Sequence, residues 1–213
     1  MDLLQLMRKA RILLEPHWIL AIGVCLVYGL AVALPAELNS YGEMVSFLLA
    51  GPLQLGLCFF FLNLVNGEEI RFELLFEGFK PLRTVLLSYT IITLLTLVGM
   101  VLLIVPGIIV ALGFSMTYYI IVDDPEISFQ NALEKSWKLT DGNKIELLEL
   151  NLRFIPWYLL GLLCLFVGFF AVIPWHNTTL ALYYQDLKER QIGQKSEEEL
   201  AEQEVHLHSL KHE

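Results

Sequence analysis

Long apolar segments alternate with short basic stretches along the whole chain. All 14 Lys and Arg residues lie in four such stretches. These contain Arg8, Lys9 and Arg11; Arg71, Lys80 and Arg83; Lys135, Lys138, Lys144 and Arg153; and Lys188, Arg190, Lys195 and Lys211. The blocks between them, 12–70, 84–134 and 154–187, contain neither residue and are largely apolar. Because a membrane-spanning helix needs about 20 apolar residues, the pattern predicts three helical hairpins, each crossing a membrane out and back.

The basic stretches also predict the orientation of the chain. Lys and Arg concentrate in the short cytoplasmic loops of membrane proteins, so we expect every basic stretch and both termini on the cytoplasmic side. The first apolar run is long for a signal peptide, and we interpret it as the first membrane helix. The sequence therefore predicts an all-α, multi-pass protein of the cytoplasmic membrane.

The number of membrane helices is less certain than their existence. Apolar runs predict spans at 18–34, 44–65, 84–105 and 154–173, with a shorter fourth span between Pro106-Gly107 and Asp123. That fourth run has 16 uncharged residues, which reach about 24 Å and imply local thinning of the bilayer or a shielded position. The return at 174–185 is shorter still. Either it crosses half the membrane, or the fifth helix begins near Leu147 and moves the turn. We expect six membrane helices, with five as the alternative.

A short amphipathic helix is expected before each hairpin, at 2–15, 68–80 and 124–140, because apolar residues recur there at helical spacing. The expected apolar positions are Leu3, Leu6, Met7, Ala10 and Leu13; Phe72, Leu75, Phe76 and Phe79; and Phe129, Ala132, Leu133 and Trp137. Asp124-Pro125 suits the start of the third helix. Pro35, Pro106 and Pro174 lie at or near the expected outer turns.

Part of this pattern repeats in the sequence. At an offset of 57 residues, Gly56 aligns with Gly113 and the segment Glu69–Glu77 aligns with Glu126–Glu134, sharing the form E-I-x-F-x-x-x-x-E. The helical membrane domain, 1–188, then divides into units of about 1–66, 68–124 and 126–188. The third unit has no comparable residue match, so a true duplication and chance similarity both remain open.

Composition narrows the class of protein. The chain is 56% hydrophobic and 17% charged, against about 25% charged in soluble domains. Six Glu and two Lys after residue 190 place −4 of the net charge of −9 in the tail, 189–213. We expect this acidic cytoplasmic tail to be a short helix or disordered. Nothing in the sequence indicates nucleic-acid binding, and its length leaves no room for a separate soluble catalytic domain.

Few polar residues lie within the apolar blocks. Charges at membrane depth tend to mark function, which makes Glu149, Asn151 and Arg153 candidate binding residues; Glu149 and Arg153 can also neutralise each other at i,i+4. His176, followed by Asn177-Thr178-Thr179, is the other candidate, although an outer turn is the favoured interpretation of this group. The three tail histidines lack partner ligands at metal spacing. We therefore expect no metal, no cofactor and no catalytic residue.

Several strings resemble the uncharacterised prokaryotic integral membrane family called domain of unknown function 975. They run in order over about residues 1–190 and include Gly51-Pro52-Leu53, Leu75-Phe76-Glu77-Gly78-Phe79-Lys80, Val105-Pro106-Gly107, Asp123-Asp124-Pro125-Glu126, Asp141-Gly142-Asn143-Lys144 and Phe154-Ile155-Pro156-Trp157. The resemblance implies a multi-helix membrane protein and carries no catalytic residues with it. Pro156 stands where the family pattern has a small residue, which puts the packing of the fifth helix in doubt.

The apolar blocks contain no recognisable catalytic motif, and this absence guides the expected function. We expect a non-enzymatic scaffold, assembly or accessory protein whose partners are the lipid bilayer and an unidentified membrane protein. A transporter or channel for small solutes or lipids is the alternative, suggested by the short fourth and sixth spans and the Pro-interrupted helices. A lipid-modifying enzyme has the least support in the sequence.

Overall fold

The chain is helical throughout the part that the structure, a computed structural model, describes: residues 2–38, 41–163 and 168–210. Helices make up 86% of the chain, and no strand occurs among the described residues. Four helical stretches are long and apolar enough to cross a membrane: Leu3–Pro35, Gly42–Asn66, Leu82–Leu102 and Ile104–Asp123. This confirms an all-α protein with membrane-type helices.

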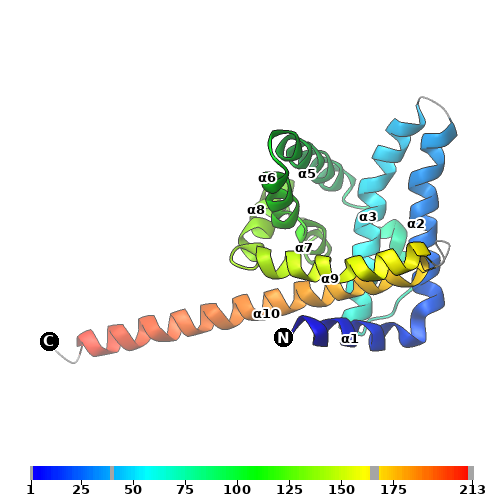
Figure 1. Cartoon of the computed structure of the whole chain (residues 1–213). Helices are drawn as coiled ribbons and strands as arrows, with labels where there is room; N and C mark the ends of the chain where they lie inside the picture. Colours follow the sequence, from blue (N-terminus) through cyan, green and yellow to red (C-terminus); the bar gives the residue numbers. More distant parts are fainter. Residues whose placement is uncertain (1, 39–40, 164–167, 211–213) are drawn as a thin grey trace.

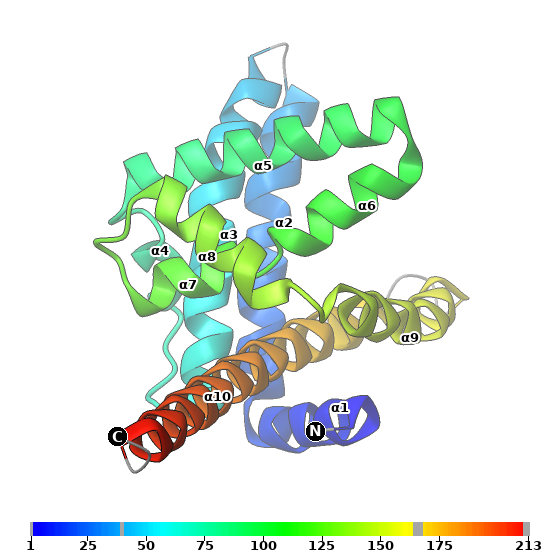
Figure 2. The ribbon, with the colours of Figure 1, turned by 90° about the vertical axis from the view of Figure 1, so that its left-hand side faces the viewer.

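The long helices pack as three consecutive pairs. Helix α2 (Trp18–Leu38) lies along α3 (Gly42–Asn66), α5 (Leu82–Leu102) along α6 (Ile104–Gly113), and α9 (Lys144–Leu163) along α10 (Phe169–Leu210). The three pairs point in different directions from a common centre, as the two views in Figures 1 and 2 show. Their outer parts are rich in exposed apolar side chains, because little of the chain packs against them.

The centre is formed by the second helix of each pair. There α3 contacts both α10 and α7 (Thr117–Asp123), the short continuation of α6. Tyr119 of α7 and Tyr184 of α10 stack with ring centroids 5.3 Å apart. Phe60, Phe61 and Tyr183 are fully buried. Since burying one large apolar side chain contributes about 1.5–3 kcal/mol, this cluster dominates the packing that holds the three pairs together.

Three short helices connect the pairs into a ring. Helix α4 (Leu74–Glu77) packs on α3, and α8 (Phe129–Thr140) packs on α6 and α7. Helix α1 (Leu3–Leu14) packs on α10, and its Leu6, Ala10 and Leu14 are fully buried. Each short helix therefore covers the second arm of the preceding pair, and the first covers the last. Figure 1 shows α1 alongside α10 at the bottom of the molecule.

The second short helix is much shorter than expected. Only Leu74–Glu77 is helical within 68–80, so the prediction of a helix over the whole segment is wrong. The reason is a close backbone contact with α3: a Cβ on Gly56 would lie 1.9 Å from the Leu75 carbonyl oxygen, and one on Gly78 1.9 Å from that of Pro52. Leu75 is fully buried at this contact, which holds the segment against α3 instead of letting it extend as a helix.

The third short helix begins later than expected, and its buried face differs. Its N-cap is Ser128, whose hydroxyl accepts a hydrogen bond from the Asn131 N–H at 3.3 Å, so the expected start at Asp124 is wrong. The buried positions are Ala132, Ser136, Leu139 and Thr140. Trp137, on the expected apolar stripe, is 37% exposed. Ser136 and Thr140 face the protein because their hydroxyls contact the carbonyl at the end of α6.

The fourth predicted span is interrupted. Helix α6 ends at Gly113 and α7 starts at Thr117, which leaves the Gly113 carbonyl without a helical N–H partner. The Ser136 hydroxyl donates to this oxygen at 2.9 Å. The Thr140 hydroxyl lies 3.2 Å from the same oxygen and 3.0 Å from the Ser136 carbonyl oxygen. The first turn of α6 is largely exposed, whereas much of α7 is buried. The second half of this short span is thus shielded by the bundle, one of the two possibilities that its length implied.

Two predicted turns are displaced. The connection between α5 and α6 is the extended residue Leu103 (φ −162°, ψ 138°), so Pro106 lies in the first turn of α6, where proline is tolerated. Helix α9 ends at Leu163 and α10 begins at Phe169. Pro174 is therefore inside α10, and its assignment to an outer turn is wrong. Helix α9 begins at Lys144, close to the early start near Leu147 that the sequence left open.

Candidate functional site

The charged candidates on α9 pair with each other. Arg153 Nη2 lies 2.6 Å from Glu149 Oε1, and both side chains are substantially exposed. Asn151 donates from Nδ2 to the Leu147 carbonyl of the preceding turn at 2.7 Å. His176 lies on another helix, α10, so the structure does not bring the four candidates together. Glu149, Asn151 and Arg153 have the contacts of a self-neutralising helix surface.

Glu146, which shares a helical face with Glu149 in sequence, has a different partner. Arg190 of α10 donates to its two carboxylate oxygens at 2.8 and 3.1 Å, and Arg190 also pairs with Asp186 at 2.6 Å. The hydrogen bond from Arg190 lowers the pKa of Glu146 below its usual range. This bidentate contact ties the start of α9 to the end of the buried part of α10.

A second polar contact ties α7 to the same part of α10. The Asp123 carboxylate accepts from the Tyr184 hydroxyl and from Lys188 Nζ, each at 2.5 Å. Gln185 forms a hydrogen bond with Asn66 at the end of α3. The ends of α3 and α7 and the start of α9 therefore all bond to one segment of α10, which fixes the direction in which α10 leaves the bundle.

His176 lies between α9 and α10 and not in a turn. Its Nδ1 is 2.9 Å from the Tyr158 hydroxyl, and its ring packs 4.5 Å from that of Phe154. Thr178 and Thr179 are fully buried and donate to backbone carbonyls one turn earlier. The expectation that this group forms a polar outer turn is wrong, because all four residues lie within α10, where the Thr178 and Thr179 hydroxyls donate to the helical backbone.

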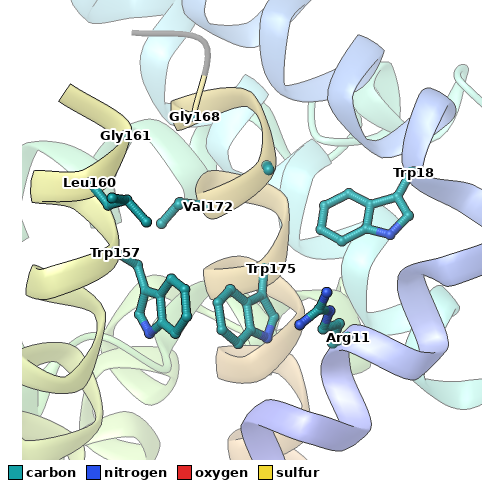
Figure 3. Close-up of a pocket in the computed structure, with 9 residues that line it drawn as sticks. Arg11, Trp18, Trp157, Leu160, Gly161, Gly168, Val172 and Trp175 are labelled. Atoms are coloured by element: carbon teal, nitrogen blue, oxygen red, sulfur yellow. The ribbon is translucent and has the colours of Figure 1, made fainter. Parts of the chain in front are cut away.

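A pocket that the sequence did not suggest lies where α1, α2, α9 and α10 meet. It has a volume of about 260 Å³, and three tryptophans and an arginine line it: Trp18, Trp157, Trp175 and Arg11. Figure 3 shows the indoles of Trp157 and Trp175 side by side, with the Arg11 guanidinium beside Trp175. The remaining lining is small or aliphatic: Leu160, Gly161, Gly168, Ala171 and Val172. The pocket is therefore apolar with one cationic group.

The walls of this pocket are held in place. Trp175 donates from Nε1 to the Met7 carbonyl of α1 at 2.8 Å, and its ring lies 5.2 Å from that of Trp157. Near the connection between α9 and α10 the two backbones touch, since a Cβ on Gly168 would lie 2.5 Å from the Gly161 Cα. Gly161 and Gly168 thus bound the pocket on this side. Its residues come from two distant parts of the chain, 11–18 and 157–175, and form no linear motif, which is why sequence reasoning missed them.

Comparison with known proteins supports the family and adds no activity. The family model described as "Protein of unknown function (DUF975)" matches residues 86–191. The match confirms the family resemblance from α5 to the last contacts of α10 with the bundle. No curated protein and no solved structure matches the chain.

Proposed function

We propose that this member of the DUF975 family is a non-enzymatic membrane protein that holds a partner protein at the cytoplasmic surface of the membrane. The observation that carries the proposal is helix α10. It is 42 residues long and continues past Ile192, beyond the bundle, as Figure 1 shows. The projecting part contains five Glu and one Lys up to Leu210. A rigid, acidic arm fixed to a membrane-embedded base suits the binding of a basic partner surface.

The base is embedded through four crossings and a half-depth pair. The stretches that include α2, α3 and α5, and α6 with α7, are the four apolar enough to cross. In α9, by contrast, Glu146, Glu149 and Arg153 place charge along the first half of the helix, and charged side chains favour the membrane surface over the core. We therefore propose that the pair α9 and α10 enters from the cytoplasmic side and turns back midway, keeping both termini on that side. This arrangement replaces two of the six crossings expected from sequence.

Cysteine labelling distinguishes the two arrangements. In a background lacking the native cysteines, Tyr41→Cys, between α2 and α3, should react with an impermeant thiol reagent applied outside, and Asn143→Cys should not. Phe170→Cys is the deciding variant, since this side chain is 41% exposed on the protein and lies at the start of α10. Half-depth insertion predicts labelling of Phe170→Cys only after detergent is added. Labelling from outside in intact cells would instead establish six crossings.

The buried polar groups support a structural use of the bundle. Within the described residues, the hydroxyls of Ser136, Thr140, Thr178 and Thr179 all donate to backbone carbonyls. Large aromatic and aliphatic side chains fill the centre where α3, α7 and α10 meet. Such packing commits these four hydroxyls to helix contacts.

Transport is the second candidate, and one feature favours it. Broken helices with free backbone carbonyls bind ions in many transporters, and α6 breaks from α7 at Gly113. Here, however, that carbonyl accepts from the Ser136 hydroxyl of α8, and the Thr140 hydroxyl lies 3.2 Å from it. A carbonyl that already accepts a hydrogen bond is less available to bind an ion. We therefore rank assembly above transport.

The test compares the full chain with a truncation after Gly193. Contacts between α10 and the bundle are made by residues before this point, so the truncated protein should insert and melt like the full chain. Cross-linking in native membranes should give a stoichiometric adduct with the full chain and none with the truncation. Solute flux in liposomes containing the purified protein would instead support transport, and turnover of a labelled lipid would support an enzyme.

A further inference from the structure

We propose that the pocket formed by Trp18, Trp157, Trp175 and Arg11 binds an anionic lipid of the cytoplasmic leaflet. The lipid phosphate would pair with Arg11, and one acyl chain would lie between α9 and α10. This site is separate from the projecting arm of α10, so the inference holds or fails independently of the proposed partner binding.

The charge of the pocket favours an anionic headgroup. Arg11 forms no ion pair or hydrogen bond with another described side chain, and Glu15, just after the end of α1, does not pair with it. Arg8 and Lys9 are exposed on the same short helix as Arg11. A guanidinium presents several donors in a plane that matches phosphate oxygens. The pocket thus carries positive charge that the described protein does not neutralise.

The wall of the pocket favours an acyl chain. Beyond the tryptophans it is lined by Leu160, Ala171 and Val172 and ends at the contact of Gly161 with Gly168. Indole rings commonly lie at the headgroup level of a bilayer, with the apolar body toward the chains. The volume of about 260 Å³ is slightly below the range of about 300–1,000 Å³ typical of pockets for whole drug-sized ligands. It fits part of one chain and is too small for a helix from another protein.

Tryptophan fluorescence can test this directly, because three of the four tryptophans of the chain line the pocket. The fourth, Trp137, is removed by Trp137→Phe. The protein is placed in liposomes with lipids brominated in the acyl chain, which quench indoles on contact, carrying either phosphatidylglycerol or phosphatidylcholine headgroups. We expect the anionic lipid to bind about fivefold more tightly, the effect of one basic residue near a membrane surface.

Variants separate the pocket from general surface charge. Arg11→Gln should abolish the preference for the anionic lipid, whereas Arg11→Lys and the matched surface variant Lys9→Gln should retain it. Inorganic phosphate in excess should not compete, because it has no chain. Equal quenching by the two lipids in the unaltered protein, or a preference that survives Arg11→Gln, would overturn the proposal.

A second variant covers the case in which Arg11→Gln does not fold. Ala171→Phe, at an exposed position of the lining, should fill the pocket and reduce quenching by both lipids while leaving the protein monodisperse in detergent. Quenching and headgroup preference unchanged in this variant would show that the lipid binds elsewhere, and the assignment of the pocket would be withdrawn.

Discussion

Replacing Gly56 with alanine places one methyl group where α3 and the α4 segment touch backbone to backbone. The new Cβ would lie 1.9 Å from the Leu75 carbonyl oxygen and 2.8 Å from the Leu75 Cα. A backbone cannot turn aside as a side chain can, so α4 must move away from α3. Since Leu75 is fully buried at this contact, the displacement would open the core as well as relieve the clash.

The chain contains matched controls for this change. Gly29 lies inside α2 with nothing within 4 Å of the position that a new methyl group would take, so Gly29→Ala meets no clash. Both substitutions gain the same helix propensity, about 1 kcal/mol, and that gain cancels when the two variants are compared. What remains is the overpacking penalty, about 3 kcal/mol at the upper end of the usual range. Gly113→Ala should lie between them, because it meets the Trp137 ring at 2.4 Å and that ring is 37% exposed and can move.

Thermal unfolding in one detergent, followed by the loss of monodisperse protein, measures the series. At about 2–4 °C per kcal/mol for a chain of this size, Gly56→Ala should melt about 6–12 °C below Gly29→Ala. Gly113→Ala should fall between the two. Melting temperatures within about 2 °C of each other for Gly56→Ala and Gly29→Ala would refute the close contact of α4 with α3, and with it the ring of short helices.

Two further predictions concern polar contacts. Glu146→Gln should lower the melting temperature near neutral pH, because Arg190 stabilises the ionised carboxylate and lowers the pKa of Glu146. A depressed carboxyl pKa contributes stability above the unfolded value of about 4.5, and this contribution is lost as the pH falls through the folded value. The difference between the two proteins should therefore shrink in acid; a constant difference down to about pH 3 would contradict the pairing. Removing both hydroxyls that cap α6, by Ser136→Ala with Thr140→Val, leaves the Gly113 carbonyl without its donors and should cost about 1–3 kcal/mol. Each single change should cost less than half of this, since one donor remains. A loss of melting temperature in the double variant that equals the sum of the losses in the two single variants would argue against a shared acceptor.

Much of the candidate chemistry could be read from single residues and short spacings. The i,i+4 pair of Glu149 and Arg153 is a local property of one helix, and it forms as the spacing suggests. His176 was recognisable as a polar residue in an apolar block, but its partner Tyr158 lies 18 residues away on another helix. The pocket was beyond sequence reasoning, because Trp175 meets Met7 across 168 residues. The one sequence signal for the pocket was that Trp18 closely follows the basic stretch that contains Arg11.

The sequence by itself determined which parts of the chain are long apolar helices and where charge must stay outside the membrane. Residue type and run length decide both, and α2, α3 and α5 begin and end within a few residues of the expected spans. The tertiary structure alone decided where α4 and α6 stop. Helix α6 ends at Gly113 because α8 supplies hydroxyls for its carbonyl, and α4 stays short because α3 holds its backbone. Each ending depends on a backbone group finding its hydrogen-bond or packing partner on a different helix, and such a partner is visible only once the chain has folded.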